Sequence, residues 1–189
     1  MTRFIVAAVL VGFGGGMLAA ADDPGPKAGA GVPKLPAVVV TDKVAEKETD
    51  LAGDRKDAPT VYVFVNADQF KDSNAQFSRP AHRFLKTLDE KIGDVTDAKV
   101  VAVWVAGDAD KNKEFLPKIE KYYSNTVRGV SSADSNGPKD WALAGNATLT
   151  VVAAHKGKVV KGWAFESVNE TDVPVVVDEL KKAAEKKDK

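Results

Sequence analysis

Two uninterrupted runs of β-branched and aromatic residues constrain this chain more than any other feature of its sequence. Residues 60–66 read TVYVFVN and residues 99–106 read KVVAVWVA, so neither run alternates polar and apolar positions. Strands of this kind are typically buried on both faces of a sheet. Between them, the apolar residues of the segment 79–92 share one helical face. The pattern predicts a β-α-β unit whose strands are parallel neighbours at the sheet centre.

The rest of the chain extends this unit into a longer α/β pattern. Further elements follow from the same criteria: a strand at 38–40, a helix at 115–123 interrupted by Pro117, a loop region with a short strand near 127–130, a hairpin of strands at 148–153 and 158–160, and a helix at 173–184. The strand at 148–153 is expected to run antiparallel to the strand at 60–66. From the strand at 60–66 onward, the main elements follow the order β-α-β-α-β-β-α, which predicts an α/β fold with a central mixed β-sheet and helices on both faces.

The first 36 residues differ in composition from the rest. Arg3 precedes an uncharged apolar run that ends in three alanines at Ala21, the pattern of a secretory signal peptide. An uncleaved membrane anchor is the competing interpretation, although four glycines weaken such a helix. The Pro- and Gly-rich stretch that follows predicts a disordered linker. The expected organisation, in a periplasmic or extracellular protein, is a signal peptide (1–21), a linker (22–36), one domain (37–184) and a charged tail (185–189).

Charge and cysteine content exclude several kinds of function. The 27 Lys and Arg residues balance the 27 Asp and Glu residues, so no net charge draws the chain to nucleic acid. The chain has no cysteine, which excludes disulfides, thiolate metal sites, cysteine nucleophiles and thiol redox chemistry together. The two histidines, His82 and His155, have no carboxylate cluster with ligand spacing beside them. We expect no metal, no cofactor, no nucleic-acid partner, and no membrane partner unless the signal segment stays uncleaved.

Three local patterns resemble the thioredoxin-like superfamily over roughly residues 38–182. A buried strand, a loop and then the tetrapeptide SRPA at positions 78–81 are similar to that family's strand, Cys-Gly-Pro-Cys motif and active-site helix. The stretch 141–149 (WALAGNATL) resembles the segment that carries the family's cis-proline, with Ala147 at the proline position. Residues 155–160 (HKGKVV) are similar to its last hairpin. The additional helix makes the resemblance nearer to periplasmic thiol reductases and peroxiredoxins than to the shortest thioredoxins.

The departures from the family pattern bear directly on function. Ser78 and Ala81 stand at the two cysteine positions, so both the attacking and the resolving sulfur are missing. In the family, the helix start and the cis-proline loop form a groove that holds an extended peptide. The resemblance therefore implies a degenerate binding site at Ser78, Arg79, Pro80, Ala81, Trp141, Asn146 and Ala147. A cis bond before Ala147 costs about 2.5 to 4 kcal/mol, so we expect a trans bond there and a remodelled groove.

Another chemistry in the same cleft would depend on Ser78, Arg79 and His82. A serine attacks only when a base and an oxyanion site activate it, and the helical step places His82 on the exposed side of its helix.

The three tryptophans are the remaining candidates for function. Trp104 is expected in the core, whereas Trp141 and Trp163, the latter beyond the last strand, are candidates for a contact surface unless they too are buried.

These observations support hypotheses from different classes. The first is an exported thioredoxin-like domain without redox or other enzymatic activity, retained as a binding or scaffold module for a protein or peptide partner. The alternative is an enzyme of non-thiol chemistry that uses Ser78, Arg79 and His82. A third is a passive domain of a larger assembly that holds its partner by the edge of its sheet.

Overall fold

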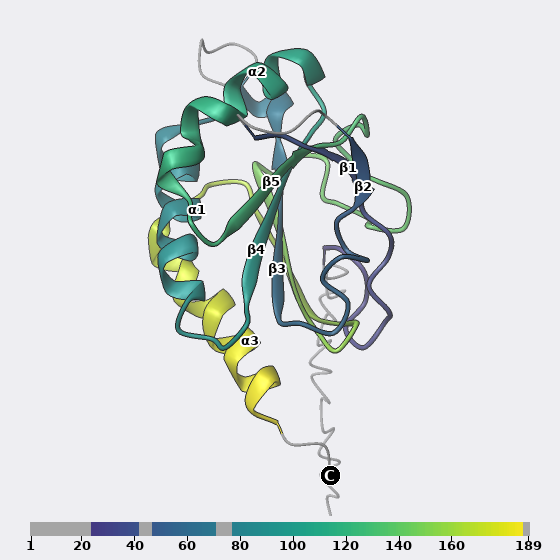
Figure 1. Ribbon diagram of the computed structural model, residues 1–189, viewed down its shortest axis with the longest axis vertical. Coiled ribbons are helices and arrows are strands. Elements are labelled where there is room, and N and C mark those ends of the chain that lie inside the picture. Colours follow the sequence, from purple (N-terminus) through teal and green to yellow (C-terminus); the bar gives the residue numbers. More distant parts are fainter. Residues whose placement is uncertain (1–23, 42–46, 71–76, 187–189) are drawn as a thin grey trace, which may run out of the picture.

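The computed structural model of the chain describes residues 24–41, 47–70 and 77–186, whose strands form one mixed sheet (Figure 1). The seven strands lie in the order β2-β1-β5-β4-β3-β6-β7. They are β1 (Pro36–Val39), β2 (Glu48–Asp50), β3 (Thr60–Asn66), β4 (Lys99–Val105), β5 (Thr126–Val130), β6 (Leu149–His155) and β7 (Lys158–Phe165). The helices are α1 (Arg79–Ile92), α2 (Ala109–Ile119) and α3 (Val173–Glu185), with short 3-10 helices η1 (Ala67–Phe70), η2 (Glu120–Tyr122) and η3 (Glu170–Asp172).

The two apolar runs form the centre of the sheet, as their sequence predicts. β3 pairs in parallel with β4 on one side and antiparallel with β6 on the other. All seven residues of β3 are buried, because the strand has neighbours on both edges and covered faces above and below. The prediction for the arrangement of these three strands is confirmed.

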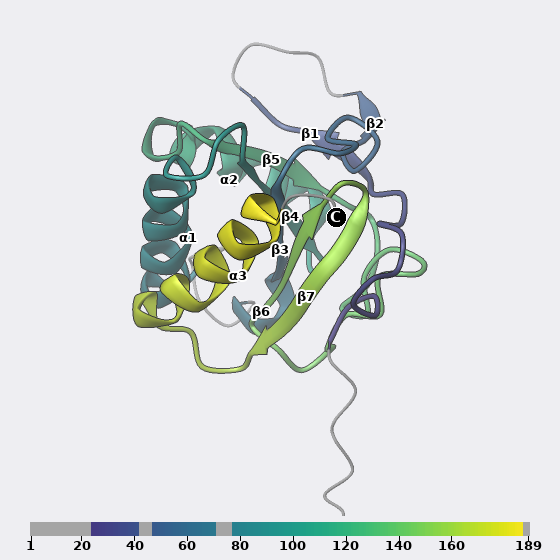
Figure 2. The same ribbon diagram turned by 90° about the horizontal axis from the view of Figure 1, so that it is seen from below.

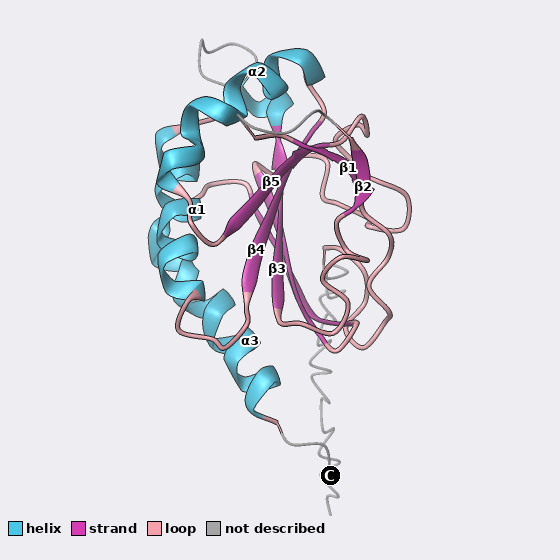
Figure 3. Cartoon of the chain, viewed as in Figure 1, coloured by secondary structure: helices cyan, strands magenta, loops and turns pink. Residues whose placement is uncertain are grey.

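The helices lie on one face of the sheet rather than on both. Side chains of α1, α2 and α3 all pack into one hydrophobic cluster, over Val61, Val63 and Val65 of β3. Figure 3 shows the three helices together on one side, with mainly loops on the other. The reason is topological: from β3 to β4 to β5 the chain steps twice in the same direction, and right-handed crossovers then place both connecting helices on the same face.

The opposite face is covered by irregular segments that pack into a second cluster. Tyr62 and Phe64 of β3 lie in that cluster, and Leu35, Leu51 and Trp141 cover them. Figure 2 shows the same division from another side, with α1 and α3 on one side of the strands and the loops on the other. The absence of helices from this face explains how loop residues come to be fully buried.

The segment expected to be a disordered linker supplies part of this cover wherever the structure describes it. We call residues 24–35 the N-terminal arm. Its Leu35 is 0% exposed, and the Leu35 N–H donates to Asp50 Oδ1 at 2.8 Å. The backbone of Gly29 and Ala30 pairs with Val159 of β7. The arm is rich in proline and glycine, as a linker is. The buried Leu35, the backbone pairing with β7, and a hydrogen bond from the Gly25 N–H to the Ala142 carbonyl nevertheless hold it against the domain. The signal-peptide residues lie outside the described ranges.

Two strands differ from the predicted pattern. β2 was not expected, because its sequence Glu-Thr-Asp has no apolar residue and the strand forms only through pairing with β1. β7 continues to Phe165, so Trp163 lies within the last strand and not beyond it. Both strands are edge strands, whose residues face solvent on one side and therefore lack the apolar pattern of a central strand.

Candidate functional site

The first turn of α1 is built as a helix cap. Ser78 is the N-cap residue, and its Oγ accepts a hydrogen bond from the Ala81 N–H at 3.3 Å. Arg79 and Pro80 are exposed, and Pro80 occupies a first-turn position that suits its missing N–H. Ala81 is 0% exposed and packs into the first cluster. Ser78 and Ala81 are thus joined across the first turn, and both serve the structure of the helix.

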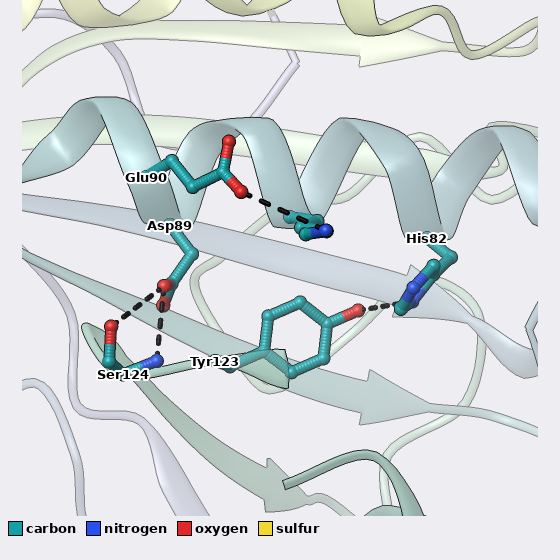
Figure 4. Close-up of polar contacts among 6 residues, drawn as sticks. His82, Asp89, Glu90, Tyr123 and Ser124 are labelled. Carbon is teal, nitrogen blue, oxygen red and sulfur yellow. Dashed lines mark hydrogen bonds and ion pairs between the residues drawn. The ribbon is translucent and has the colours of Figure 1, made fainter. Parts of the chain in front are cut away.

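His82 does not act with Ser78. Its Nδ1 lies 2.7 Å from the Tyr123 hydroxyl, and its ring makes edge contacts with Phe77, Tyr122 and Tyr123 (Figure 4). The expectation that His82 lies on the exposed side of α1 is wrong, because the segment after α2 packs against that side and half-buries the ring. Burial, and secondarily the charge of Lys86, lowers the pKa of His82 below its usual value. The hydrolytic alternative has no Ser-His pair at this site.

A buried carboxylate two turns further along α1 was not singled out by the sequence. Asp89 is 3% exposed. Its carboxylate accepts hydrogen bonds from the Ser124 N–H at 3.0 Å, the Asn125 N–H at 2.8 Å and the Thr126 hydroxyl at 2.6 Å. Figure 4 shows Asp89 and His82 reaching from the same helix to adjacent points of one segment. The contacts of Asp89 and His82 together hold α1 against residues 122–126. An isolated Asp at position 89 of a charged helix gives no sequence signal of this role.

In the loop around Ala147, which the resemblance aligns with the family's cis-proline, several backbone groups are hydrogen-bonded within the domain. Ala147 is 1% exposed, and its N–H donates to the Ala144 carbonyl at 3.0 Å. The side-chain amide of Asn66, at the end of β3, donates to the carbonyls of Gly145 at 3.0 Å and Ala147 at 3.2 Å. The neighbouring Asn146 is exposed and donates to Glu166. Within the described ranges no peptide bond is cis, as expected for Ala147. The Ala147 groups with which a peptide strand would pair are therefore already engaged.

Trp141 belongs to the core and not to a binding surface. It is 0% exposed, and its Nε1 donates to the Lys34 carbonyl of the N-terminal arm at 2.9 Å. Its ring lies 5.0 Å from that of Tyr62 and 4.7 Å from that of Phe64. The arm and the loop therefore bury Trp141 on the face of the sheet opposite to α1, which removes it from the candidate site.

Among the described residues, no three His, Asp or Glu side chains are grouped so that they could hold a metal ion. No helix that the structure describes has the length and apolar character needed to span a bilayer. The chemistry available around Ser78 is thus a capped helix start beside an aromatic cluster.

Comparisons with known proteins agree with this architecture. No family model and no curated protein matches the sequence. Among solved structures, the chain is similar to a protein from Bacteroides thetaiotaomicron provisionally described as a disulfide isomerase, with TM-score 0.59, 14% identity and coverage of 88% of this chain and 96% of that one. It is also similar to a Chlorobium tepidum protein provisionally described as the thiol:disulfide interchange protein DsbE (TM-score 0.56, 12% identity, 84% and 98% covered).

A third similar structure is the peroxidoxin BcpB of Mycobacterium tuberculosis (TM-score 0.54, 13% identity, 86% and 99% covered). Structures this distant in sequence establish the fold alone. The chain therefore has a thioredoxin-like fold, and the complete absence of cysteine separates it from the thiol chemistry that the names of these neighbours describe.

Proposed function

We propose that this chain is an exported domain of thioredoxin-like fold that acts by binding and has no thiol redox activity. The observation that carries the proposal is the α1 start, where the two positions of the family's cysteines hold a capping serine and a buried alanine. A dithiol reaction needs a thiolate and a second sulfur within reach, and neither exists in this chain. The fold and the helix cap are retained, which suits a module that presents surfaces to a partner.

The location of the binding surface follows from which backbone groups are free. The groove that the family resemblance implied is a poor site for a peptide strand, because Asn66 and Ala144 already engage the backbone of Ala147. Partner binding is therefore expected on another surface of the domain.

Export is part of the proposal and depends on the first 21 residues. The apolar run that ends in three alanines supports a mature chain beginning at Asp22. Amino-terminal sequencing of the protein isolated from the cell envelope tests this. A chain that begins at Met1 or Thr2 would contradict the proposal of a cleaved signal peptide.

Redox silence is tested by a disulfide reduction assay with insulin and dithiothreitol. The native chain is expected to show no reduction above the uncatalysed rate, and any catalysis by it would overturn the proposal. The double substitution Ser78→Cys, Ala81→Cys tests the position of the degenerate site. Because these residues are joined across one helical turn, we expect an intramolecular disulfide, measured by thiol counting, with Ser78→Cys alone as the control. Two cysteines that remain unpaired under oxidising conditions would show that the alignment is misplaced.

A further inference from the structure

β7 forms one edge of the sheet, and at eight residues it is the longest strand in the described ranges. An outer strand exposes backbone N–H and C=O groups along its free side, so a long one is a template for a further strand unless something covers it. The opposite edge is β2, which has only three residues and two acidic side chains. β7 is thus the edge where strand addition is possible over a useful length.

The chain already adds a strand of its own to the first part of this edge. Gly29 N–H donates to the Val159 carbonyl at 2.8 Å, Val159 N–H to the Ala30 carbonyl at 2.9 Å, and Val32 N–H to the Gly157 carbonyl at 2.9 Å. N-terminal to this pairing the arm lies on the face of the sheet, where the Pro24 carbonyl lies against Gly162. Among the residues that the structure describes, none pairs with the outer side of 161–165.

A groove on the helix side of β7 includes Val160, the residue that precedes this open segment. It has a volume of about 390 Å³ and runs between Val160 and the C-terminal half of α3, with Ala183 in its wall and charged residues at its rim. Trp163 is half-buried on the same face, packed against the first cluster, with Lys161 Nζ 5.6 Å from its ring centre. A strand added to β7 would direct alternate side chains to the helix side of the sheet, the side on which the groove and Trp163 lie.

The charges around the groove select among possible strands. β7 itself carries the exposed Lys158 and Lys161 and no carboxylate, so the edge strand has a surplus of positive charge. At the rim of the groove the charges balance, because Lys182 of α3 and Lys186 just after it stand beside Glu179 and Glu185. Glu179 is already paired with Lys182 at 2.8 Å. The hydrogen bond and charge of Lys182 lower the pKa of Glu179 below its usual value, and Lys161 and Lys186 contribute to the same shift. The surplus of positive charge favours carboxylates on an incoming chain and disfavours lysines.

We propose that the outer edge of β7 at Lys161–Phe165, together with the groove beside α3, binds an extended acidic peptide segment of a partner protein by strand addition. The inference rests on the proposed function, for which it names the surface and the class of partner. Backbone pairing with β7 supplies the affinity, and the lysines select carboxylates on alternate residues. The existing pairing with the arm shows that this edge holds a strand in antiparallel register.

The test uses the mature chain, residues 22–189, and three seven-residue peptides with blocked ends. The first alternates glutamate and valine, the second alternates lysine and valine, and the third is the first with a central proline. Hydrogen exchange read by NMR locates binding. The glutamate peptide is expected to slow exchange of amides within 161–165 at least about tenfold, whereas the lysine and proline peptides leave them unchanged. Equal protection by the lysine peptide, or none by the glutamate peptide, overturns the proposal.

Two variants separate a specific site from general attraction. Lys161→Glu is expected to weaken binding of the glutamate peptide at least about tenfold, and Lys139→Glu, on an exposed loop, to leave it unchanged. If both variants bind alike, the assignment of the site is wrong. Protection of 161–165 that grows with protein concentration in the absence of peptide would identify a second copy as the occupant and overturn the peptide assignment. The insulin assay tests a separate claim. A chain that is redox silent but does not bind the glutamate peptide would refute the strand-addition inference and leave the proposed absence of thiol redox activity standing.

Discussion

Asp89 shows how much of the tertiary structure one side chain can hold. Its carboxylate is the common acceptor for backbone and hydroxyl donors at Ser124, Asn125 and Thr126. These groups are shielded from water, so a donor that loses its acceptor is not easily compensated. The contact joins residues 35 to 37 positions apart, from α1 to the start of β5.

Replacement of Asp89 by alanine is therefore expected to lower the free energy of unfolding by about 3 kcal/mol, because several charge-assisted hydrogen bonds are lost at once. Urea denaturation followed by circular dichroism measures the change. The matched control is Glu90→Ala, next in sequence but exposed, which should change stability by less than about 0.5 kcal/mol. Equal effects of the two substitutions would show that the Asp89 contacts contribute nothing beyond those of a surface carboxylate.

His82 is the residue through which moderate acidity should act. Its pKa is lowered in the folded chain by burial and then by Lys86, so the unfolded state binds a proton at higher pH than the folded state does. Stability therefore rises with pH between the two pKa values. The contribution of neutral His82 to stability is fully present above the pKa of the unfolded state, near 6.5. It declines as the pH falls through that pKa toward the pKa of the folded state.

We expect the free energy of unfolding to be smaller at pH 5.5 than at pH 7.5, and His82→Gln to reduce this difference. The measurement is urea denaturation at both pH values. A His82→Gln chain with the full native pH dependence would contradict the role assigned to this histidine.

At the scale of elements, α1 depends on its cap. Ser78 satisfies one of the backbone donors that the first helical turn leaves without an intrahelical partner. Pro80 and the buried Ala81 fix the direction in which the chain enters the helix. The position that carries the reaction in thiol enzymes of this fold is thus occupied by a group that stabilises the helix.

Ser78→Ala is expected to reduce stability by about 1 kcal/mol, and Ser78→Asp to retain it, because aspartate also caps and its charge suits the helix N-terminus. Thermal unfolding of the three chains under identical conditions provides the comparison. If aspartate is as destabilising as alanine, the contribution of Ser78 does not come from capping.

At the scale of the whole molecule, the N-terminal arm is packed and hydrogen-bonded as part of the folded domain. It pairs with β7, accepts the Trp141 hydrogen bond through Lys34, and inserts Leu35 into the second cluster. Its passage across the sheet is possible because Gly162 has no side chain: a Cβ there would lie 1.8 Å from the Pro24 carbonyl oxygen.

Gly162→Ala should therefore displace the arm and lower stability by about 1 to 3 kcal/mol, as overpacked positions do. Hydrogen exchange at Gly25 and Gly29 and limited proteolysis at Lys27 are both expected to accelerate. Gly31→Ala is the matched control in the arm itself, since a Cβ at that position meets no atom within 4 Å. An arm equally protected in both variants would show that contact with Gly162 does not hold it.

The sequence by itself determined the central strands, the apolar face of α1, the order of the main elements and the exclusion of thiol chemistry. These features are local: a run of β-branched residues, a helical period, a capping serine, or a missing residue type is visible without knowledge of neighbours in space. The thioredoxin-like fold follows from their order, whereas the alignment of Ser78, Ala81 and Ala147 with the family's site stays a prediction.

Only the tertiary structure decided which side chains face solvent and which backbone groups are free. Trp141 and the Pro- and Gly-rich arm bury each other although 107 residues separate Trp141 from Lys34. His82 is covered by Tyr123 from another element, and all three helices share one face because two crossovers step the same way. Pairings over such separations depend on the path of the whole chain, and no local pattern of hydrophobicity or propensity contains that path.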